Sequence, residues 1–360
     1  MKQTVVIHSG SSWEKWNFKS IDQGGIGGSE SWQILLAREF DKLGYRVINF
    51  NDCEQDCIDG KINYFHYSKF EEFIEYNYID YFISSRSTDV FKLNIRAKNS
   101  YVQIHDVWML SDRNQLFLDK VTKFCCLSEW HREFVADYHK ISPDKIAITS
   151  NGIDLNRFLN QDIERIPFRL IYSSSLDRGL DNLLYVFDFI KKELPKLELH
   201  IFYGLNTWEK SAEIRPDEKE KIKKMKEAMN KDGIFYHGRV GQNRLAEEML
   251  KSSLWVYPTS FEETFCITSI EAQAAGLPVI CSNYAGLRTT VNDTGILIGD
   301  GSKYYSYSLA GRTEFFNKVI QILKDKEIWT FWSKKSIENA NKYSWDKVAL
   351  GWVDLFKASQ

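Results

Sequence analysis

The chain has 360 residues, enough for two domains of ordinary size, and 43% of them are hydrophobic, which is sufficient for a sizeable core. Its net charge of -2 gives no general attraction to nucleic acid or to an anionic membrane. The six cysteines lack a zinc-binding spacing, and no apolar run approaches the roughly 18 residues that span a bilayer or resembles a signal peptide. These features indicate a soluble cytoplasmic protein and leave peripheral contact with a membrane open.

The chain opens with a predicted βαβ unit that has glycines at its turn from strand to helix. Its parts in order are a strand at 4–8, a polar and aromatic loop at 9–23, glycines within 24–28, a helix at 29–43 and a strand at 46–50. The glycines do not have the G-x-G-x-x-G spacing, so a nicotinamide cofactor is not indicated. Glycines at a helix start let a phosphate approach backbone N–H groups, and we therefore expect a ligand here rather than an unliganded flexible loop.

Strands and helices continue to alternate up to a polar stretch at 155–167. The expected strands lie at 79–84, 100–104, 123–127 and 146–149, and a helix at 129–138. His105 and Asp106 follow the strand at 100–104, and ligands of open parallel sheets bind at such strand ends. A lone histidine in this position is as often structural as functional, so the position alone does not decide the role of His105.

A second α/β series follows the polar stretch. Its expected strands lie at 168–173, 197–203, 234–237, 254–257, 279–281 and 296–298, and its helices at 181–193, 216–230, 244–251, 311–324 and 345–358. The sequence therefore predicts two doubly wound, parallel-sheet domains, 1–160 and 165–342, that face a central cleft. Two such domains suit a pair of substrates, one held by each.

The stretch 261–283 holds two carboxylates, Glu263 and Glu271, with seven residues between them. On one helix such positions would point about 80° apart. If Glu263 instead lies in a loop before the helix, both can reach a ligand over the helix N-terminus, where free N–H groups and the helix dipole favour phosphate. The alternative is that Glu263 only caps the helix and Glu271 is solvated. Gly276 and Pro278 mark the end of the helix.

Taken together, these motifs resemble the retaining glycosyltransferases of family 4, which have the GT-B fold of two Rossmann-like domains. The resemblance covers nearly the whole chain. Its markers, in the family's order, are Gly27-Gly28-Ser29-Glu30, His105-Asp106, Ser128-Glu129, Asn151-Gly152-Ile153-Asp154, Arg178-Gly179, Gly238, Glu263-x7-Glu271, Ala275-Gly276-x-Pro278-Val279 and Tyr343-Ser344-Trp345. It implies that a last helix, about 345–360, packs back on the first domain.

The resemblance also implies an activity. Family members transfer a sugar from a nucleotide-diphosphate sugar to a hydroxyl of an acceptor such as a glycan or a lipid-linked molecule, with retention at the anomeric carbon. We accordingly expect no metal and no other cofactor, since the nucleotide-sugar is a substrate, and no nucleic acid partner. A nucleotide-sugar epimerase and an inactive nucleotide-sugar-binding protein remain as alternatives.

The resemblance assigns roles to particular residues. Glu263 would hold hydroxyls of the donor sugar near the reacting carbon, and His105 would line the catalytic cleft. Glu271 would bind the ribose, and Arg178 would supply positive charge to the diphosphate. The full expected donor-binding set is Gly27, Gly28, Arg178, Arg239, Val240, Phe265, Cys266, Ile267 and Glu271. Trp13 and Trp16 are the expected acceptor contacts because aromatic faces suit sugar rings, with packing against the domain surface as an equal alternative.

Three positions depart from the family pattern. Ser173 stands where the family often has an arginine, Cys266 where it usually has a glycine, and Thr289 where it has an acidic residue. One cationic partner of the diphosphate is therefore missing or comes from elsewhere in the chain, and we expect Cys266 to narrow the pocket.

Overall fold

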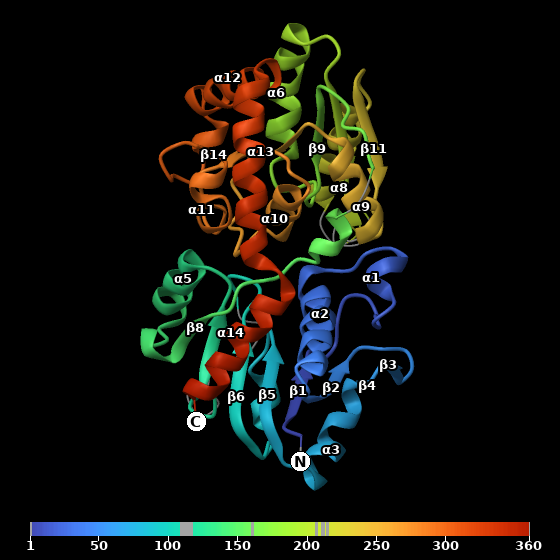
Figure 1. Ribbon diagram of the computed structural model, residues 1–360, viewed down its shortest axis with the longest axis vertical. Coiled ribbons are helices and arrows are strands. Elements are labelled where there is room, and N and C mark those ends of the chain that lie inside the picture. The colour runs from blue at the N-terminus through green and yellow to red at the C-terminus, as the bar shows by residue number, and fades with distance from the viewer. Residues whose placement is uncertain are drawn as a thin grey trace. The chain divides into compact units, whose positions relative to one another are not determined.

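The computed structural model describes residues 2–108, 118–159, 162–205, 208–209, 213 and 216–359. The chain forms two compact units, one of Met1–Gly152 with Tyr343–Gln360 and one of Ile153–Lys342. Each unit is built on one sheet, and the strands pair in parallel apart from one edge pair in the first unit (Figure 1). The predicted α/β class with two parallel sheets is confirmed.

The first unit contains an eight-stranded sheet of order β3-β4-β2-β1-β5-β6-β7-β8. Its strands are β1 Thr4–His8, β2 Arg46–Asn51, β3 Cys57–Asp59, β4 Ile62–His66, β5 Ile79–Ser85, β6 Ala97–Gln103, β7 Lys123–Cys126 and β8 Ile146–Ile148. The central strand β1 is apolar on both faces because both are covered: Val5 and Ile7 belong to one core and Val6 to the other. Val5 pairs with Val47 of β2 on one side and with Tyr81 of β5 on the other.

The helices of the first unit include one from the far end of the chain. They are α1 Ser20–Gln23, α2 Gly28–Lys42, α3 Phe70–Tyr76, α5 Glu129–His139 and α14 Trp345–Ala358. The last of these, α14, packs on α2, and its Trp352 and Phe356 lie in the same core as Trp32 (Figure 1). Phe356 stacks on Tyr81 with 4.0 Å between ring centroids, so the C-terminal helix contributes to the folding of the N-terminal unit.

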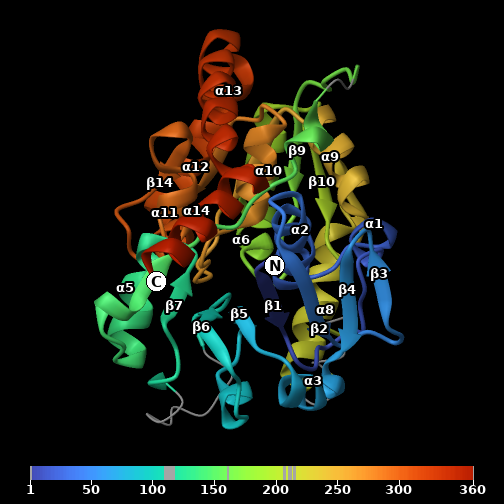
Figure 2. The same cartoon turned by 60° about the horizontal axis from the view of Figure 1, so that its bottom comes forward.

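The second unit contains a six-stranded parallel sheet of order β11-β10-β9-β12-β13-β14. Its strands are β9 Arg169–Tyr172, β10 Glu198–Phe202, β11 Ile234–Gly238, β12 Leu254–Tyr257, β13 Val279–Ser282 and β14 Ile296–Ile298. Its helices are α6 Leu180–Glu193, α8 Pro216–Met229, α9 Gln242–Lys251, α10 Ile267–Ala274, α11 Leu287–Thr290, α12 Leu309–Lys324 and α13 Lys326–Ala340. In two views α12 lies beside β14 (Figures 1 and 2).

Several elements were not expected from the sequence. The strands β3 and β4, the helix α3 and the long helix α13 are the main ones. Only Asp325 separates α12 from α13, so the sequence has no glycine or proline to mark the break. The Asp325 side chain accepts hydrogen bonds from the N–H groups of Glu327 and Ile328, which starts the new helix.

The structure divides the chain after Gly152, earlier than the 160–165 region that the sequence indicates. Residues Leu155–Phe158 form a turn of 3-10 helix, and Phe158 packs against the core of the second unit. The further 3-10 turns are Tyr67–Lys69, Asp89–Lys92, Pro143–Lys145, Asn292–Thr294, Tyr305–Tyr307 and Asn341–Tyr343.

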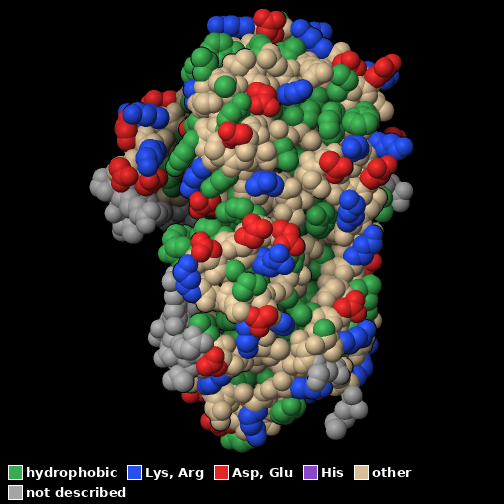
Figure 3. Space-filling model, turned by 90° about the vertical axis from the view of Figure 1, so that its left-hand side faces the viewer, with side chains coloured by type: hydrophobic (Ala, Val, Ile, Leu, Met, Phe, Trp, Pro, Cys, Tyr) green, Lys and Arg blue, Asp and Glu red, His purple; other side chains and the backbone are tan. Residues whose placement is uncertain are grey.

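The surface carries charges of both signs. On the face in Figure 3, Lys and Arg side chains alternate with Asp and Glu side chains without a broad region of one sign, in keeping with the net charge of -2. Among the residues that the structure describes, no helix has both the length and the apolar character needed to cross a membrane.

Candidate functional site

The second sheet has its topological switch point between β9 and β12. From β9 the strand order proceeds through β10 to β11, and from β12 it proceeds the other way through β13 to β14. Open α/β sheets bind ligands at the carboxyl ends of the strands at such a point. The loops that follow β9 and β12 touch closely: Gly179 has a φ of 99°, and a Cβ there would lie 2.7 Å from the carbonyl oxygen of Pro258. Glycine is therefore required where the two loops meet.

An ion pair joins these two loops. Arg178, after β9, places Nη1 3.2 Å from Oε1 of Glu263, after β12. The guanidinium also stacks on the Phe261 ring, 3.8 Å from its centroid. Burial would lower the pKa of Arg178, but the Glu263 carboxylate raises it above its usual value, so the guanidinium stays charged. About a third of the Arg178 side chain (34%) is exposed, which leaves it accessible to a ligand.

Two adjacent glutamates at this site have different partners. Glu263 is only 7% exposed and bonds Arg178, whereas Glu262 accepts from Lys303 Nζ at 2.9 Å and from the Tyr284 hydroxyl at 3.2 Å. Of the two glutamates, Glu263 is therefore the one that pairs with Arg178 at the switch point. The spacing of seven residues before Glu271 selects the same glutamate.

Glu263 lies in the loop before α10, as the sequence analysis assumed, and it does not cap the helix. The N-cap position is Cys266, without a side-chain cap bond, and its φ of 68° is one that favours glycine. The Cys266 side chain packs into the core of the second unit. Phe265 is likewise buried, and Ile267 begins the helix, so these residues would meet a ligand through backbone N–H groups.

A close backbone approach fixes the Glu263 loop. The Gly286 N–H donates to the carbonyl oxygen of Glu263 at 2.7 Å, and a Cβ on Gly286 would lie 2.5 Å from that oxygen. The glycine of the Ala285-Gly286 pair is therefore needed for this contact, whatever residue stands at position 289.

Glu271 is buried, so the alternative that it is a solvated helix residue is wrong. It is 8% exposed on α10, and burial raises its pKa to about 7 against the opposing effect of Arg157. The Nη1 atom of Arg157 lies 4.0 Å from Oε1 of Glu271. Near neutral pH the carboxyl group can therefore exist in both protonation states, and it can accept or donate a hydrogen bond.

Arg239 and Val240 lie farther from the switch point than the other predicted donor-binding residues. They follow β11, the edge strand, which β10 separates from β9. The Arg239 side chain lies against Gly204, after β10, where a Cβ would be 3.2 Å from that of Arg239.

The predicted N-terminal residues meet at the corresponding end of the first sheet. Gly27 is the N-cap of α2 and Gly28 its first residue, after the loop that leaves β1. Arg86, after β5, places Nη1 3.9 Å from Oε1 of Glu30 in α2 and Nε 3.2 Å from Oδ2 of Asp106. Arg86 thus contacts both the helix that follows the glycine turn and the polar pair that follows β6. These contacts lie at the switch point between β1 and β5.

His105 is 8% exposed and lies edge-on to Trp32, with 5.0 Å between ring centroids. Burial, with the charges of Arg86 and His131, lowers the pKa of His105 well below its usual value. The imidazole is therefore neutral at physiological pH. His105 and the glycine turn belong to the first unit, and Arg178, Glu263 and Glu271 to the second.

The two tryptophans proposed for the acceptor differ sharply. Trp13 is 87% exposed, whereas Trp16 is 3% exposed and packs in the core of the first unit. The packing alternative therefore applies to Trp16, which has little surface to offer a sugar. Trp13 stays the predicted acceptor contact.

Sequence reasoning missed several residues of these sites. Three of them contact residues of the predicted motifs: Arg86 pairs with Asp106, Arg157 lies near Glu271, and Tyr257 bonds Glu263. The fourth, Ser174, bonds Tyr257. The available signals were weak: Tyr257 ends β12, Ser174 follows β9 by two residues, and Arg86 follows a buried strand. In the described part of the chain, no three His, Cys, Asp or Glu side chains gather so as to hold a metal ion.

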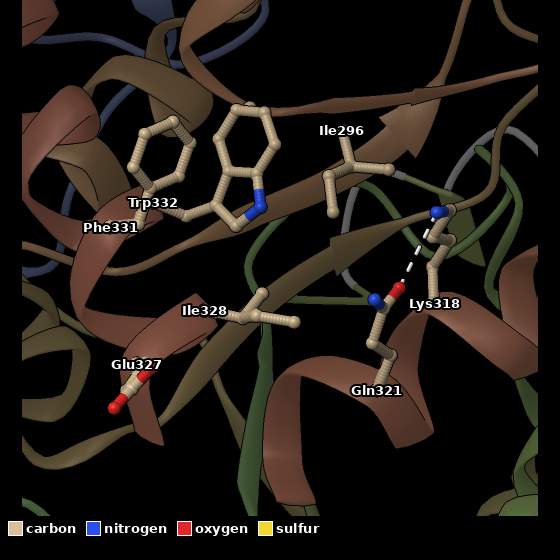
Figure 4. Close-up of a pocket in the computed structure, with 8 residues that line it drawn as sticks. Ile296, Lys318, Gln321, Glu327, Ile328, Phe331 and Trp332 are labelled. Atoms are coloured by element: carbon tan, nitrogen blue, oxygen red, sulfur yellow. Dashed lines mark hydrogen bonds between the residues drawn. The ribbon is translucent and has the colours of Figure 1, made fainter. Parts of the chain in front are cut away.

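The second unit also has a groove away from these residues. A groove of about 550 Å³ between β14, α12 and α13 is lined by apolar side chains, Ile296, Ile328, Phe331 and Trp332, and on one side by Lys318 and Gln321, which lie 3.4 Å apart (Figure 4). None of the predicted site residues lines it. The candidate site is defined here by its charged groups and its place in the sheet.

Comparison with known proteins finds a family model that matches part of the chain. Residues 161–338 match the family model of glycosyl transferases group 1. An uncharacterized 41.2 kDa protein in the cps region of Klebsiella pneumoniae is 24% identical over 224 residues, which cover 61% of this chain and 56% of that protein. A D-inositol 3-phosphate glycosyltransferase of Streptomyces griseus is 29% identical over 130 residues, 36% of this chain and 25% of that protein. The matches therefore span about half or less of these relatives.

The fold is similar to solved structures over the full chain. Sucrose-phosphate synthase from Thermosynechococcus elongatus superposes with a TM-score of 0.71 at 15% identity and covers 99% of both chains. Such a likeness establishes the fold alone, and the predicted GT-B fold is confirmed.

Proposed function

We propose, from the match of residues 161–338 to glycosyl transferases group 1, that this protein is a glycosyltransferase that takes a sugar from a nucleotide-diphosphate sugar. The sugar would pass to a hydroxyl of a glycan, a lipid-linked molecule or another acceptor, with retention at the anomeric carbon and without a metal. The observation that carries the proposal is the pair of Arg178 and Glu263 at the switch point of the second sheet.

The bond that breaks joins the donor sugar to the diphosphate, and each residue of the pair suits one of these two groups. Departure of a nucleoside diphosphate builds negative charge on phosphate oxygens, and a fixed guanidinium with backbone N–H groups can stabilise that charge. Arg178 and the N–H groups at the start of α10, from Cys266 and Ile267, are the groups we assign to it. Glu263 would accept hydrogen bonds from hydroxyls of the donor sugar.

No covalent enzyme intermediate is part of the proposal. The acceptor oxygen would attack the anomeric carbon from the face on which the diphosphate leaves. The bond from carbon to phosphate oxygen breaks, the bond from carbon to acceptor oxygen forms, and the acceptor proton passes to the leaving diphosphate. The role of the protein is then to hold the reactants and to stabilise charge.

Glu271 is assigned to the ribose of the nucleotide. The Glu271 carboxyl group lies on α10 and is 8% exposed, and it could exchange hydrogen bonds with the ribose hydroxyls. Arg239 and Val240, after the edge strand, are assigned to the base. In the first unit, neutral His105 is assigned to the donor sugar, Gly27 and Gly28 to the diphosphate, and exposed Trp13 to the acceptor.

A panel of donors tests the proposal. The protein is incubated with the glucose, galactose and mannose derivatives of UDP, GDP and ADP, with and without acceptors. Inositol phosphate belongs among the acceptors because the Streptomyces relative is named a D-inositol 3-phosphate glycosyltransferase. Nucleotide release that depends on an acceptor, with product of retained configuration, supports the proposal, and inverted product contradicts retention.

The same panel separates the alternatives. Interconversion of the donor without nucleotide release would identify an epimerase, and binding without turnover an inactive binding protein. The departures Ser173 and Cys266 are the features that favour the inactive protein. Both have structural partners: the Ser173 hydroxyl accepts from Trp255 Nε1 at 3.2 Å, and Cys266 lies in the core.

A further inference from the structure

A tyrosine that belongs to no recognised motif contacts Glu263 more closely than Arg178 does. The Tyr257 hydroxyl donates to Oε1 of Glu263 at 2.6 Å, and it accepts from the Ser174 hydroxyl at 3.0 Å. Tyr257 is the last residue of β12 and is 0% exposed, and Ser174 follows β9. The hydroxyl chain from Ser174 through Tyr257 to Glu263 therefore crosses the switch point.

The arrangement leaves one carboxylate oxygen for a ligand. Among the residues that the structure describes, the hydrogen bonds to the Glu263 carboxylate come from Tyr257 and Arg178, and both fall on Oε1. Two donors on one oxygen fix the plane and the rotamer of the carboxylate. The other oxygen, Oε2, is then held in a set direction.

A second buried tyrosine holds the other half of the pair. The Tyr172 hydroxyl contacts the carbonyl oxygens of Ser175 at 2.7 Å and of Arg178 at 3.2 Å, so it fixes the loop that carries Arg178. The Tyr172 and Tyr257 rings lie 5.7 Å apart between centroids. Each central strand thus ends in a tyrosine that holds one member of the Arg178–Glu263 pair.

We propose that Tyr257 is a positioning residue that aims the Glu263 carboxylate at the hydroxyls of the donor sugar, with Ser174 setting the direction of the Tyr257 hydroxyl. This inference rests on the proposed function. Burial raises the pKa of Tyr257 well above its usual value, so the hydroxyl keeps its proton at any working pH. Its ring fills the core, and the positioning role belongs to the hydroxyl alone.

Tyr257→Phe removes that hydroxyl and keeps the ring. With the donor that the panel identifies, we expect kcat to fall about 10- to 100-fold, the range for a lost hydrogen bond to a charged group. Affinity for the free nucleotide, which has no sugar, should stay within about twofold of the wild type because Glu263 faces the sugar. A merely structural loss would lower nucleotide affinity and thermal stability together.

Tyr284→Phe is the matched control. It deletes the same atom from a bond of 3.2 Å to the neighbouring carboxylate, Glu262, and should leave kcat within about twofold. Ser174→Ala should show part of the loss of kcat expected for Tyr257→Phe. If Tyr257→Phe does not fold, Ser174→Ala tests the proposal in its place. Equal rates in Tyr257→Phe and Tyr284→Phe, or an unchanged rate in Ser174→Ala when Tyr257→Phe is unfolded, overturn the proposal.

A double-mutant cycle tests whether Tyr257 acts through Glu263. On a Glu263→Gln background, adding Tyr257→Phe should change the rate, or the affinity for the intact donor, by less than about twofold. Independent, multiplying effects would contradict the positioning role. A wild-type protein inert toward every donor would instead overturn the proposed function, and this inference with it.

Discussion

At the scale of single residues, Glu263 and Glu271 show how environment separates two identical side chains. Glu263 accepts hydrogen bonds from the Arg178 guanidinium and from the Tyr257 hydroxyl. Glu271 has Arg157 only at 4.0 Å, and burial raises its pKa to about 7. The spacing between the two glutamates could be read from the sequence. The difference between their surroundings could not, because Arg157 and Arg178 lie far from both glutamates along the chain.

The raised pKa of Glu271 predicts an unusual dependence of stability on pH. The folded protein retains a proton that the unfolded chain, with its ordinary glutamate pKa of about 4.5, has already lost. The stabilisation is therefore complete below about pH 4.5 and is lost as pH rises through about 7. Glu271→Gln removes this effect.

We expect Glu271→Gln to be more stable than the wild type at pH 8 by about 2–4 kcal/mol, with the difference falling to about 1 kcal/mol at pH 5. Urea unfolding of both proteins at the two pH values measures this. A difference that is independent of pH, or that grows toward acid pH, would show that Glu271 does not titrate as assigned.

At the scale of elements, the contact between the loops after β9 and β12 sets the site. Local patterns predicted most strands and helices well, with β1, β12, β14 and α14 placed at their observed ends. The helix α13 was missed because its start is marked by Asp325 alone. The neighbouring order of β9 and β12 was outside the reach of local patterns, since it depends on packing between segments far apart in sequence.

Gly179 tests this loop contact. An alanine Cβ would meet the Pro258 backbone at 2.7 Å in addition to the strain of a φ of 99°, so Gly179→Ala should destabilise the second unit by about 2–4 kcal/mol. Gly238 also has a positive φ of 71° but open space around it, so Gly238→Ala should be destabilised by only about 1 kcal/mol. Unfolding midpoints in urea compare the two, and equal shifts would argue against the steric contact.

At the scale of the whole molecule, alternating strands and helices predicted two parallel-sheet units, and the GT-B fold of similar structures agrees. The ordered motifs assign the candidate site to particular loops, which stays a prediction. They did not predict Arg86, Tyr257 or the burial of Trp16, because each depends on which loops the folded sheets bring together. A single aromatic residue in a loop can face solvent or core, and its sequence context does not distinguish the two.

Metal independence is a prediction that belongs to the proposed function. Arg178 and backbone N–H groups are assigned the stabilising role that a divalent cation has in other phosphate chemistry. Turnover with the identified donor should therefore persist within about twofold in excess EDTA, measured after dialysis against chelator. Loss of activity that added Mg²⁺ or Mn²⁺ restores would show that the leaving group needs a cation.

The central claim is that Glu263 serves transfer from a nucleotide-sugar, and its most direct test compares Glu263→Ala with Glu262→Ala. The two variants remove neighbouring carboxylates of the same loop, but only Glu263 bonds Arg178 and Tyr257. We predict that Glu263→Ala loses at least about 100-fold in acceptor-dependent nucleotide release while it remains folded, and that Glu262→Ala stays within about threefold of the wild type. Wild-type turnover by a folded Glu263→Ala protein would contradict the claim.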